Sequence, residues 1–374
     1  NAYKCFCSKE ELANSREASS NFSYSKTCRN RDTDAFKKTD PFTVRIKVSS
    51  ASAIQFKDKI YSSISVAGDE IDDFIIARTD GSPTYNLVVV VDDYDMNISH
   101  IIRGEDHISN TSKQIIIYKL LGWDLPEFAH LPMILGPDKK RLSKRHGATG
   151  LDSFKKLGYY PEAMFNYLAL LGWNPGTEQE IFNINELINN FTLDKINKSA
   201  AVFDRKKLNW INSQKLMGEE PESIYKSIID LYLDWGASKS SDFCYKVIHQ
   251  LKPRSDSLID LVNQSDYFFS NLLKYDNELR NKVWKEETNS ILEHYSHSIS
   301  NVISWDSKNL EAHLKKVVSD LEVGFGKVMQ PVRFLITGKI NGPSLFEVMV
   351  ILEKELCLKR LKSYLDFKLN KRTP

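Results

Sequence analysis

The pattern of hydrophobic residues changes near Gly150, and this change constrains the fold more than any other feature. Before it, short β-branched runs and alternating apolar residues predict strands. After it, apolar residues recur at helical spacing through most of the sequence. A chain of 374 residues is also too long for one typical hydrophobic core. We therefore expect several domains, with an α/β part followed by an all-α part.

Two kinds of strand are predicted in the first part. Residues Phe42–Val48 alternate between apolar and polar side chains, and residues 53–66 continue in that style, which suggests a small α+β module up to about residue 75. The run LVVVVDD (87–93) is apolar until its two aspartates, which predicts a strand buried on both faces of a parallel sheet. The segment HIIRGEDH (100–107) has the same form. Ligand sites lie beyond the carboxyl ends of such strands.

Helices are predicted wherever apolar residues follow the helical period. The predicted helical segments are 109–123, 159–173, 182–191 and 201–212. The string GEEPES (Gly218–Ser223) is interpreted as a linker, and the chain after it is helix-rich, with turns expected at 324–331 and 338–344. Cys244 and Cys357 fall within helical patterns and are expected in the core.

The segment Asp138–Thr149 is strongly basic. Eight consecutive positions in it hold five Lys or Arg residues and one His, although the whole chain has 51 basic and 49 acidic residues. Three interpretations are open: a solvated surface loop, a patch that binds nucleic acid, or a clamp for phosphate groups. Ser143 between basic residues, after Gly136 and Pro137, suits a loop that closes over a polyphosphate. The pattern GxxxxGK[ST] does not occur in the sequence, which argues against P-loop chemistry.

Three of the five cysteines lie near the start of the chain. Cys5 and Cys7 are two positions apart, so an extended segment would place both thiols on one face, close enough to share an ion. Cys28 follows, and no His lies nearby. A structural zinc site needs four ligands. Two interpretations are open at this point, a zinc site or three reduced buried cysteines, and the odd count favours a reducing compartment.

Several motifs in register resemble one family. The string RLSKR (Arg141–Arg145) is similar to the second signature of class I aminoacyl-tRNA synthetases, whose common form reads Lys-Met-Ser-Lys-Ser. The longer string KRLSKRHGA resembles the glutamyl-tRNA synthetase version. The strings that resemble the same family, in its usual order, are DGSPTYNLVVVVDD, IIRGEDHISNTSKQ, FAHLPMILG, GYYPEAMFNYLALLGW, SAAVFDRKKLNWIN and FGKVMQPVRFLITGKINGPSLFEVM. The chain looks like a bacterial-type glutamyl-tRNA synthetase over nearly its whole length.

The resemblance implies a set of residues that handle ATP. Lys144 would contact the ATP phosphates and stabilise the departing pyrophosphate. Arg141 stands where the family usually has Lys, which keeps the charge but changes its geometry. Ser143 and Arg145 belong to the same implied catalytic loop. Outside the loop, the implied ATP contacts are Asp106, at the place of an acidic group near ATP, and Ile134, through its backbone to adenine.

The resemblance also implies a glutamate site. Tyr85 and the segment up to Val89 match a strand of the family that contacts glutamate, and Arg103 matches an Arg that binds the amino acid. A guanidinium group forms a bidentate, charge-assisted pair with a carboxylate. Such a pair would separate glutamate from glutamine, whose side chain carries no negative charge.

For the cysteines, the resemblance implies a structural zinc ion. Some members of the family carry Cys-x-Cys followed by Tyr-x-x-x-Cys at the matching place, and Tyr24 and Cys28 have that spacing. Other members end in Cys-x-His, but the corresponding residue here is Asn30. The implied ligands are therefore Cys5, Cys7, Tyr24 and Cys28.

The implied fold is multidomain, α/β plus all-α. Residues 1–75 would form an acceptor-stem-binding insertion domain with the zinc site. Residues 76–135 would form the second half of a Rossmann-like nucleotide-binding fold, and residues 136–215 a stem-contact region with the RLSKR loop. Residues 216–374 would form an α-helical anticodon-binding region.

The implied reaction joins L-glutamate to tRNA(Glu) through glutamyl-adenylate, with ATP and Mg²⁺ and without a covalent enzyme intermediate. The family resemblance further implies a cytoplasmic monomer. No membrane partner is expected, since no apolar run approaches the roughly 20 residues that span a bilayer.

The first class I signature, His-Ile-Gly-His or a variant, does not occur in the sequence. The family places it upstream of the CFC stretch, so we expect that a portion of the natural protein preceding Asn1 carries it. The alternatives to this family are a short enzyme that glutamylates queuosine, a glutaminyl-tRNA synthetase with β-barrels, and a non-catalytic RNA-binding protein. The helical pattern after residue 216 disfavours the first two, and the missing signature is the only support for the third.

Overall fold

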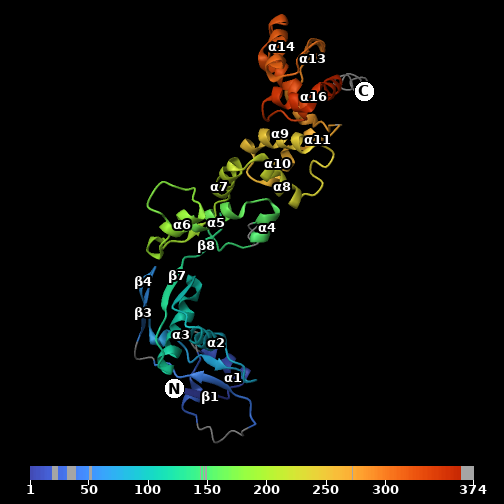
Figure 1. Ribbon diagram of the computed structural model, residues 1–374. Coiled ribbons are helices and arrows are strands. Elements are labelled where there is room, and N and C mark those ends of the chain that lie inside the picture. Colours follow the sequence, from blue (N-terminus) through green and yellow to red (C-terminus); the bar gives the residue numbers. More distant parts are fainter. Residues whose placement is uncertain are drawn as a thin grey trace. The chain divides into compact units, whose positions relative to one another are not determined.

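In the computed structural model (Figure 1), which describes most of the chain, the chain forms two compact units. The first unit comprises Asn1–Ser143, Ala169–Gln179 and Asn185–Phe203, and the second comprises Lys144–Leu168, Glu180–Ile184 and Asp204–Pro374. The described residues are 1–18, 24–31, 39–49, 53–143, 145, 147, 150–271 and 273–363, without the side chains of 15–18. Each unit is described by itself below.

The first unit begins with a small antiparallel sheet. Its strands are β1 (Ala2–Cys5), β2 (Thr43–Ile46) and β5 (Ile75–Ala77), in the order β1-β2-β5. Helix α1 (Lys9–Ala18) and the 3-10 helix η1 (Thr27–Arg29) connect β1 to β2. The strand expected at Phe42–Val48 is confirmed as β2.

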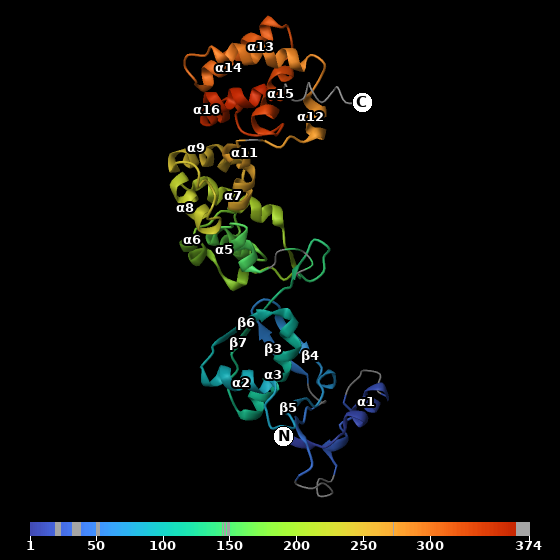
Figure 2. The same cartoon turned by 90° about the vertical axis from the view of Figure 1, so that its right-hand side faces the viewer.

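A second sheet of the same unit carries the residues of most interest (Figure 2). Its order is β4-β3-β7-β6, with β3 (Ile54–Asp58) antiparallel to β4 (Ser62–Val66) and parallel to β7 (Glu127–Leu131). Strand β6 (His100–Gly104) is parallel to β7, which confirms the strand expected there. Strand β3 comes from the range expected to form the insertion domain, yet it pairs with a strand of the range expected to form the nucleotide-binding fold.

The strand predicted for the run LVVVVDD is wrong, because this run lies in helix α2 (Tyr85–Asp95). Its valines are not equally buried: Val90 is fully buried in one apolar cluster, whereas Val88 is 36% exposed. The cluster includes Ile116 and Ile117 of helix α3 (Ile108–Leu121). Packing of one helix face therefore overrides the strand preference of β-branched residues. The two aspartates of the run belong to the last turns of α2 rather than to a strand end.

The helix expected around 109–123 is confirmed as α3, which ends at Gly122 in the left-handed conformation (φ 72°). Further along the first unit, β8 (Ile134–Leu135) pairs in parallel with β9 (Ala201–Val202). The remaining short 3-10 helices of this unit are η2 (Gly68–Glu70), η3 (Glu105–His107) and η5 (Leu193–Lys195).

Helices dominate the second unit, as expected. In chain order, the helices from residue 151 onward are α4 (Leu151–Lys156), α5 (Pro161–Leu170), α6 (Ile184–Asn190), α7 (Arg205–Gly218), α8 (Pro221–Leu231), α9 (Ser241–Leu251), η6 (Lys252–Arg254), α10 (Leu258–Gln264), α11 (Asp266–Phe269), α12 (Asn277–Val283), α13 (Thr288–Ser300), α14 (Ser307–Asp320), α15 (Phe325–Thr337) and α16 (Leu345–Lys362). Pro161 begins α5, and the linker interpreted at 218–223 is reduced to the residues between α7 and α8. None of the described helices is both long and apolar enough to cross a bilayer.

The turn predicted at 324–331 is wrong, because helix α15 begins at Phe325 and continues through Pro331. Proline removes one helical hydrogen bond. The helix tolerates this loss because it buries a continuous apolar face, with Val328, Val332 and Leu335 fully buried. The turn expected at 338–344 is confirmed, since it separates α15 from α16.

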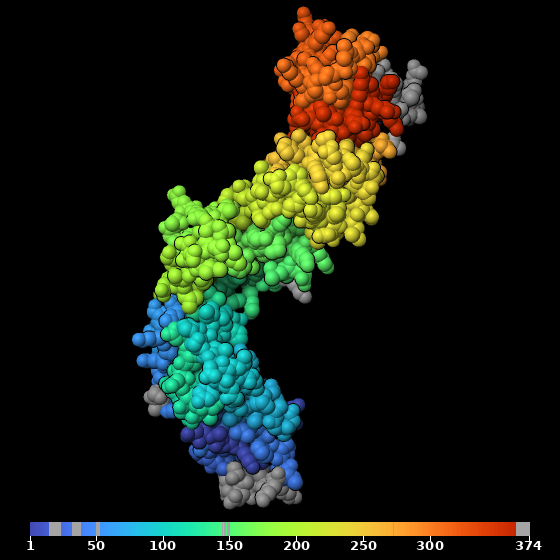
Figure 3. Space-filling view, viewed as in Figure 1, coloured from blue at the N-terminus to red at the C-terminus, as the bar shows by residue number. Residues whose placement is uncertain are grey.

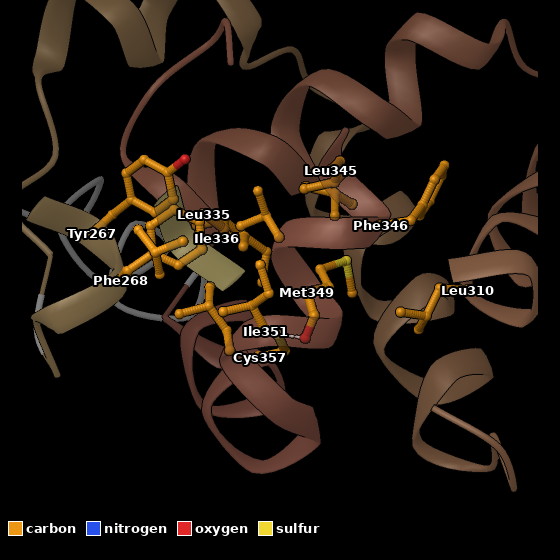
Figure 4. Close-up of a cluster of buried hydrophobic side chains, with 14 of the residues drawn as sticks. Tyr267, Phe268, Leu310, Leu335, Ile336, Leu345, Phe346, Met349, Ile351 and Cys357 are labelled. Atoms are coloured by element: carbon orange, nitrogen blue, oxygen red, sulfur yellow. Dashed lines mark hydrogen bonds between the residues drawn. The ribbon is translucent and has the colours of Figure 1, made fainter. Parts of the chain in front are cut away.

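One large core joins helices of the second unit, and the yellow and orange-red regions of this unit touch in the space-filling view (Figure 3). Figure 4 shows part of this core, with Tyr267 and Phe268 of α11 facing Leu335 and Ile336 of α15. Cys244 and Cys357 are fully buried in it, as predicted.

Candidate active site

Arg103 lies near the carboxyl end of strand β6 and is held from behind by helix α3. Its Nη2 donates to Thr111 Oγ1 at 2.5 Å and to Gln114 Oε1 at 2.7 Å. Thr111 and Gln114 are almost fully buried. Burial lowers the pKa of the Arg103 guanidinium, and Tyr85 and Asp93 act in the opposite direction. The residue predicted to bind glutamate is therefore a fixed, partly buried cation.

Helix α2 brings Tyr85 to the same place. Tyr85 begins the helix, is 48% exposed, and its ring centroid lies 6.2 Å from that of His107. Val89 lies about one turn further along the same side of α2 and is half-buried. Burial raises the pKa of Asp93, while Arg103 lowers it. The segment expected to contact glutamate is thus helical, and Tyr85 lies beside the Arg103 guanidinium.

Two residues predicted to bind ATP meet next to this site. Arg141 Nη2 lies 3.4 Å from Asp106 Oδ2, with both side chains accessible to solvent. An ion pair exposed to this degree is weak, so a phosphate group could displace it. The neighbouring Glu105 accepts hydrogen bonds from the Met133 backbone at 2.9 Å and from the Tyr61 hydroxyl.

The first part of the basic segment is an ordered hairpin. Gly136 N donates to Lys140 O at 2.8 Å, and Leu142 N donates to Ile134 O at 2.9 Å. Lys139 adopts the left-handed conformation that closes this turn (φ 58°). The backbone of Ile134 is therefore held by this hairpin, and its carbonyl oxygen keeps a second lone pair for another donor.

Four residues of the basic segment lie outside the described residues, namely Lys144, His146, Ala148 and Thr149. The role predicted for Lys144 therefore stays a prediction. Ser143 and Arg145 are described, and both take part in further interactions.

The cysteines expected to bind metal come together in the first unit. The Sγ atoms of Cys5, Cys7 and Cys28 all lie within 4.8 Å of one another, and Cys7 and Cys28 are 3.4 Å apart. The Tyr24 hydroxyl lies 3.3 Å from Cys5 Sγ and 3.7 Å from Cys7 Sγ. Ligands about 2.3 Å from a tetrahedral zinc ion are about 3.8 Å apart, so these four groups fit such an ion. The three thiols are free, and two of them are buried.

The thiols differ in acidity. Burial raises the pKa of the Cys7 thiol to about 12. Burial has the same effect on Cys5, but hydrogen bonds with Tyr24, the Cys7 backbone and Arg45 outweigh it and lower the pKa of Cys5 to about 7. Because metals bind the thiolate form, Cys5 is the thiol best prepared to bind a cation at neutral pH.

The sequence and the fold of the chain are similar to those of known proteins. Residues 1–210 match the family model of the class I tRNA synthetases (E and Q), catalytic domain, and residues 224–365 match the model of an anticodon-binding domain. A catalytic domain of this kind followed by a helical anticodon-binding domain defines a class I aminoacyl-tRNA synthetase. The β-barrel and short-enzyme alternatives do not account for the helical match at 224–365.

Individual relatives are more specific. A glutamate–tRNA ligase of Syntrophotalea carbinolica is 40% identical over 366 residues, which cover 96% of this chain and 78% of the relative. One of Caldicellulosiruptor saccharolyticus is 37% identical, covering 96% and 77%. The crystal structure of a glutamate tRNA ligase from Elizabethkingia meningosepticum in complex with its amino acid matches with a TM-score of 0.83 at 28% identity, covering 98% and 79%. The chain belongs to the glutamate–tRNA ligase family.

Several residues of the site were not anticipated from the sequence. Glu105, Thr111 and His130 lie inside the strings that resemble the family, but no role was assigned to them. No local pattern in the sequence indicates a role for Asp58 or Tyr61. The hydrogen-bond partner of Tyr61 is 44 positions away in the chain, and that of Asp58 is 72 positions away.

Proposed function

We propose that the chain activates L-glutamate with ATP and transfers it to the 3′ end of tRNA(Glu). An α-carboxylate oxygen of glutamate would attack the α-phosphorus of ATP, and pyrophosphate would leave. The terminal ribose of the tRNA would then attack the carbonyl carbon of the adenylate, and AMP would leave. The observation that carries this proposal is the fixed Arg103 beside Tyr85 in a chain of this family.

Arg103 would hold the side-chain carboxylate of glutamate. A partly buried guanidinium has lost part of its hydration, which makes an anionic partner more favourable than a neutral amide. Tyr85 and Val89 would form the wall along the substrate. Glutamine would leave the cation without a negative partner, so it would bind more weakly.

The basic segment would act on ATP. Lys144, Arg141, Ser143 and Arg145 would neutralise the negative charge on the phosphates as pyrophosphate departs, with Mg²⁺ entering as the ATP complex. The other ATP contacts would be Asp106, now paired with Arg141, and the Ile134 backbone. Binding of ATP would separate the exposed Asp106–Arg141 pair and free the guanidinium for phosphate.

Cys5, Cys7, Tyr24 and Cys28 would hold a structural zinc ion. The ion would join β1 to η1 and take no part in the reaction. We also propose the domain division 1–75, 76–135, 136–215 and 216–374, with acceptor-stem, nucleotide-binding, stem-contact and anticodon-binding roles. The free cysteines favour a cytoplasmic protein, and a monomer would suffice for the reaction.

The proposal is tested by charging tRNA(Glu) with radiolabelled glutamate or glutamine, using the full-length protein. Charging is expected with glutamate alone. Arg103→Lys keeps the charge but cannot reach all the partners of the guanidinium, so the KM for glutamate is expected to rise roughly 10- to 100-fold. Arg78→Lys, at an exposed arginine bonded to Ser82 and Pro83, is the matched control. Equal charging with glutamine would contradict the proposed specificity.

A further inference from the structure

A chain of buried hydrogen bonds runs behind Arg103. His130 Nδ1 lies 2.7 Å from Asp58 Oδ2, and His130 Nε2 lies 2.8 Å from Thr111 Oγ1. Thr111 Oγ1 in turn lies 2.5 Å from Arg103 Nη2. The side chains of Asp58, His130 and Thr111 have no exposure to solvent, and the chain of contacts links β3, β7, α3 and β6.

The far end of this chain is firmly anchored. Asp58 Oδ1 accepts from the backbone N–H groups of Ile60 and Tyr61, both at 2.9 Å. Its Oδ2 accepts from the backbone of His130 at 3.1 Å as well as from the ring. All these groups are backbone or buried, so the position of the His130 ring is set by the fold.

Each hydrogen bond in the chain has one direction. An ionised carboxylate only accepts, so His130 Nδ1 donates to Asp58. Burial lowers the pKa of His130, which keeps the ring neutral and makes Nε2 an acceptor. The hydroxyl of Thr111 then donates to Nε2 at 2.8 Å and is shared with the His107 carbonyl, to which it also donates at 3.1 Å. The Thr111 oxygen therefore presents lone pairs to Arg103.

Gln114 completes the support. Its Oε1 accepts from Arg103 Nη2 at 2.7 Å, and its Nε2 donates to Asn86 Oδ1 at 3.2 Å, which orients the amide. Nη2 has two protons, and Thr111 and Gln114 take both. Nε is buried without an acceptor, and no described residue accepts from Nη1 in hydrogen-bond geometry, although the Tyr85 side chain lies close enough to interact with the guanidinium. The donors that remain for a substrate are those of Nη1.

We propose that Asp58, His130 and Thr111 are positioning residues that turn the Nη1 edge of Arg103 toward the carboxylate of glutamate, an inference that rests on the function proposed above. A guanidinium held at one nitrogen by two oriented acceptors cannot rotate about its long side chain. The substrate then meets a donor already in place, so less conformational freedom is lost on binding. Loss of one of these hydrogen bonds should therefore raise the KM for glutamate and leave the KM for ATP unchanged.

The test compares Thr111→Val with Thr111→Ser in tRNA charging by the full-length protein. Valine keeps the shape of threonine but removes the hydroxyl, whereas serine keeps the hydroxyl. We expect Thr111→Val to raise the KM for glutamate roughly tenfold, consistent with loss of one charge-assisted hydrogen bond, with the KM for ATP unchanged. Thr111→Ser should restore the wild-type KM. The matched control is Ser112→Ala, which removes a neighbouring buried hydroxyl that has no hydrogen-bond partner among the described residues.

A second variant keeps the proposal testable if Thr111→Val does not fold. His130→Asn can turn its amide N–H toward Asp58, but its side chain is too short to bring an acceptor to Thr111, and it should give the same rise in the KM for glutamate. An unchanged KM for glutamate, or equal rises for glutamate and ATP, would overturn the positioning role. Wild-type protein that charges no glutamate would remove the proposed function together with this role, whereas wild-type charging with no effect at Thr111 would remove this role alone.

Discussion

At the scale of single residues, buried charges organise the first unit. The carboxylate of Asp73 has no solvent exposure and accepts hydrogen bonds from Arg29, the Val48 backbone at 2.9 Å and the Tyr3 hydroxyl at 2.7 Å. These partners lie in η1, after β2 and in β1. Asp73 therefore joins the segment that carries Cys28 to the sheet that carries Cys5.

We predict that Asp73→Asn destabilises the protein by about 3–5 kcal/mol at pH 7, because it leaves the Arg29 cation without its buried partner. Burial alone would raise the pKa of Asp73, but Arg29, Val48 and Tyr3 outweigh it, so its folded pKa is lower than its unfolded pKa. The stabilisation is thus present above pH about 4 and is lost as the pH falls through the folded pKa.

Urea unfolding of both proteins at several pH values measures this effect. The difference between wild type and Asp73→Asn should shrink below pH about 4. Asp80→Asn is the control, because this exposed carboxylate accepts hydrogen bonds from Ser82 in its own turn. A difference that stays constant down to low pH would argue against the ionised Asp73.

The metal ligands lead to a second prediction. We expect about one zinc ion per purified chain, and Cys28→Ser should remove most of it because a hydroxyl binds zinc poorly. Cys244→Ser, which alters another buried cysteine far from the cluster in sequence, should retain the zinc. Elemental analysis measures both, and equal zinc in wild type and Cys28→Ser would exclude the site.

At the scale of elements, close contacts between helices limit which residues can occupy the segments that connect them. Gly158 joins α4 to α5 with φ 72°, and an added Cβ would lie 2.4 Å from the Cβ of Leu258 at the start of α10. The backbone bond from Leu258 N to Gly158 O, at 3.2 Å, holds the two segments together. Only a residue without a side chain fits there.

We predict that Gly158→Ala destabilises the protein more than Gly338→Ala. Both glycines have φ near 70° in the second unit, but a Cβ at Gly338 would meet only Lys274 O at 3.5 Å. Both variants should lose about 1–2 kcal/mol from the left-handed backbone, and Gly158→Ala should lose a further 1–3 kcal/mol or so from the clash. Thermal unfolding followed by circular dichroism compares them. Equal losses would show that Leu258 moves aside freely.

At the scale of the whole molecule, the catalytic match and the anticodon-binding match occupy different parts of one chain. Arg103, Tyr85 and Asp106 lie in the first compact unit, and the helical match lies in the second. A tRNA that binds both matched regions would couple them. The catalytic site would then be complete only when the acceptor end and the anticodon end of the tRNA are both bound.

We predict that ATP–pyrophosphate exchange by the full-length protein requires tRNA. Without tRNA, exchange should stay at the background rate measured without enzyme, because the site would be completed only when tRNA is bound. A minihelix with an acceptor stem but no anticodon arm serves as the comparison and should restore less of the rate. Equal exchange with and without tRNA would refute the coupling.

Much of the fold could be predicted because its signals are local. Helical periodicity located α3, α5, α6 and α7 and indicated that the chain after Gly218–Ser223 is helix-rich, and alternation identified β2. The wrong predictions fall where tertiary packing overrides local preference. The valines of α2 are β-branched, yet they form a helix because one face of that helix packs against α3. Pro331 lies inside helix α15, whose apolar face is fully buried. Local preferences of about 1 kcal/mol per residue cannot compete with burial of a whole face.

The sequence by itself determined the family, through motifs such as RLSKR and IIRGED, and the candidate residues that carry charge, from Arg103 to the cysteines. Only the tertiary structure decided how those residues are supported. The bond between Asp58 and His130 joins positions 72 apart, and Cys28 reaches Cys7 from 21 positions away. Hydrogen bonds act over about 3 Å, so such pairs exist only after the strands have packed, and no local pattern records them.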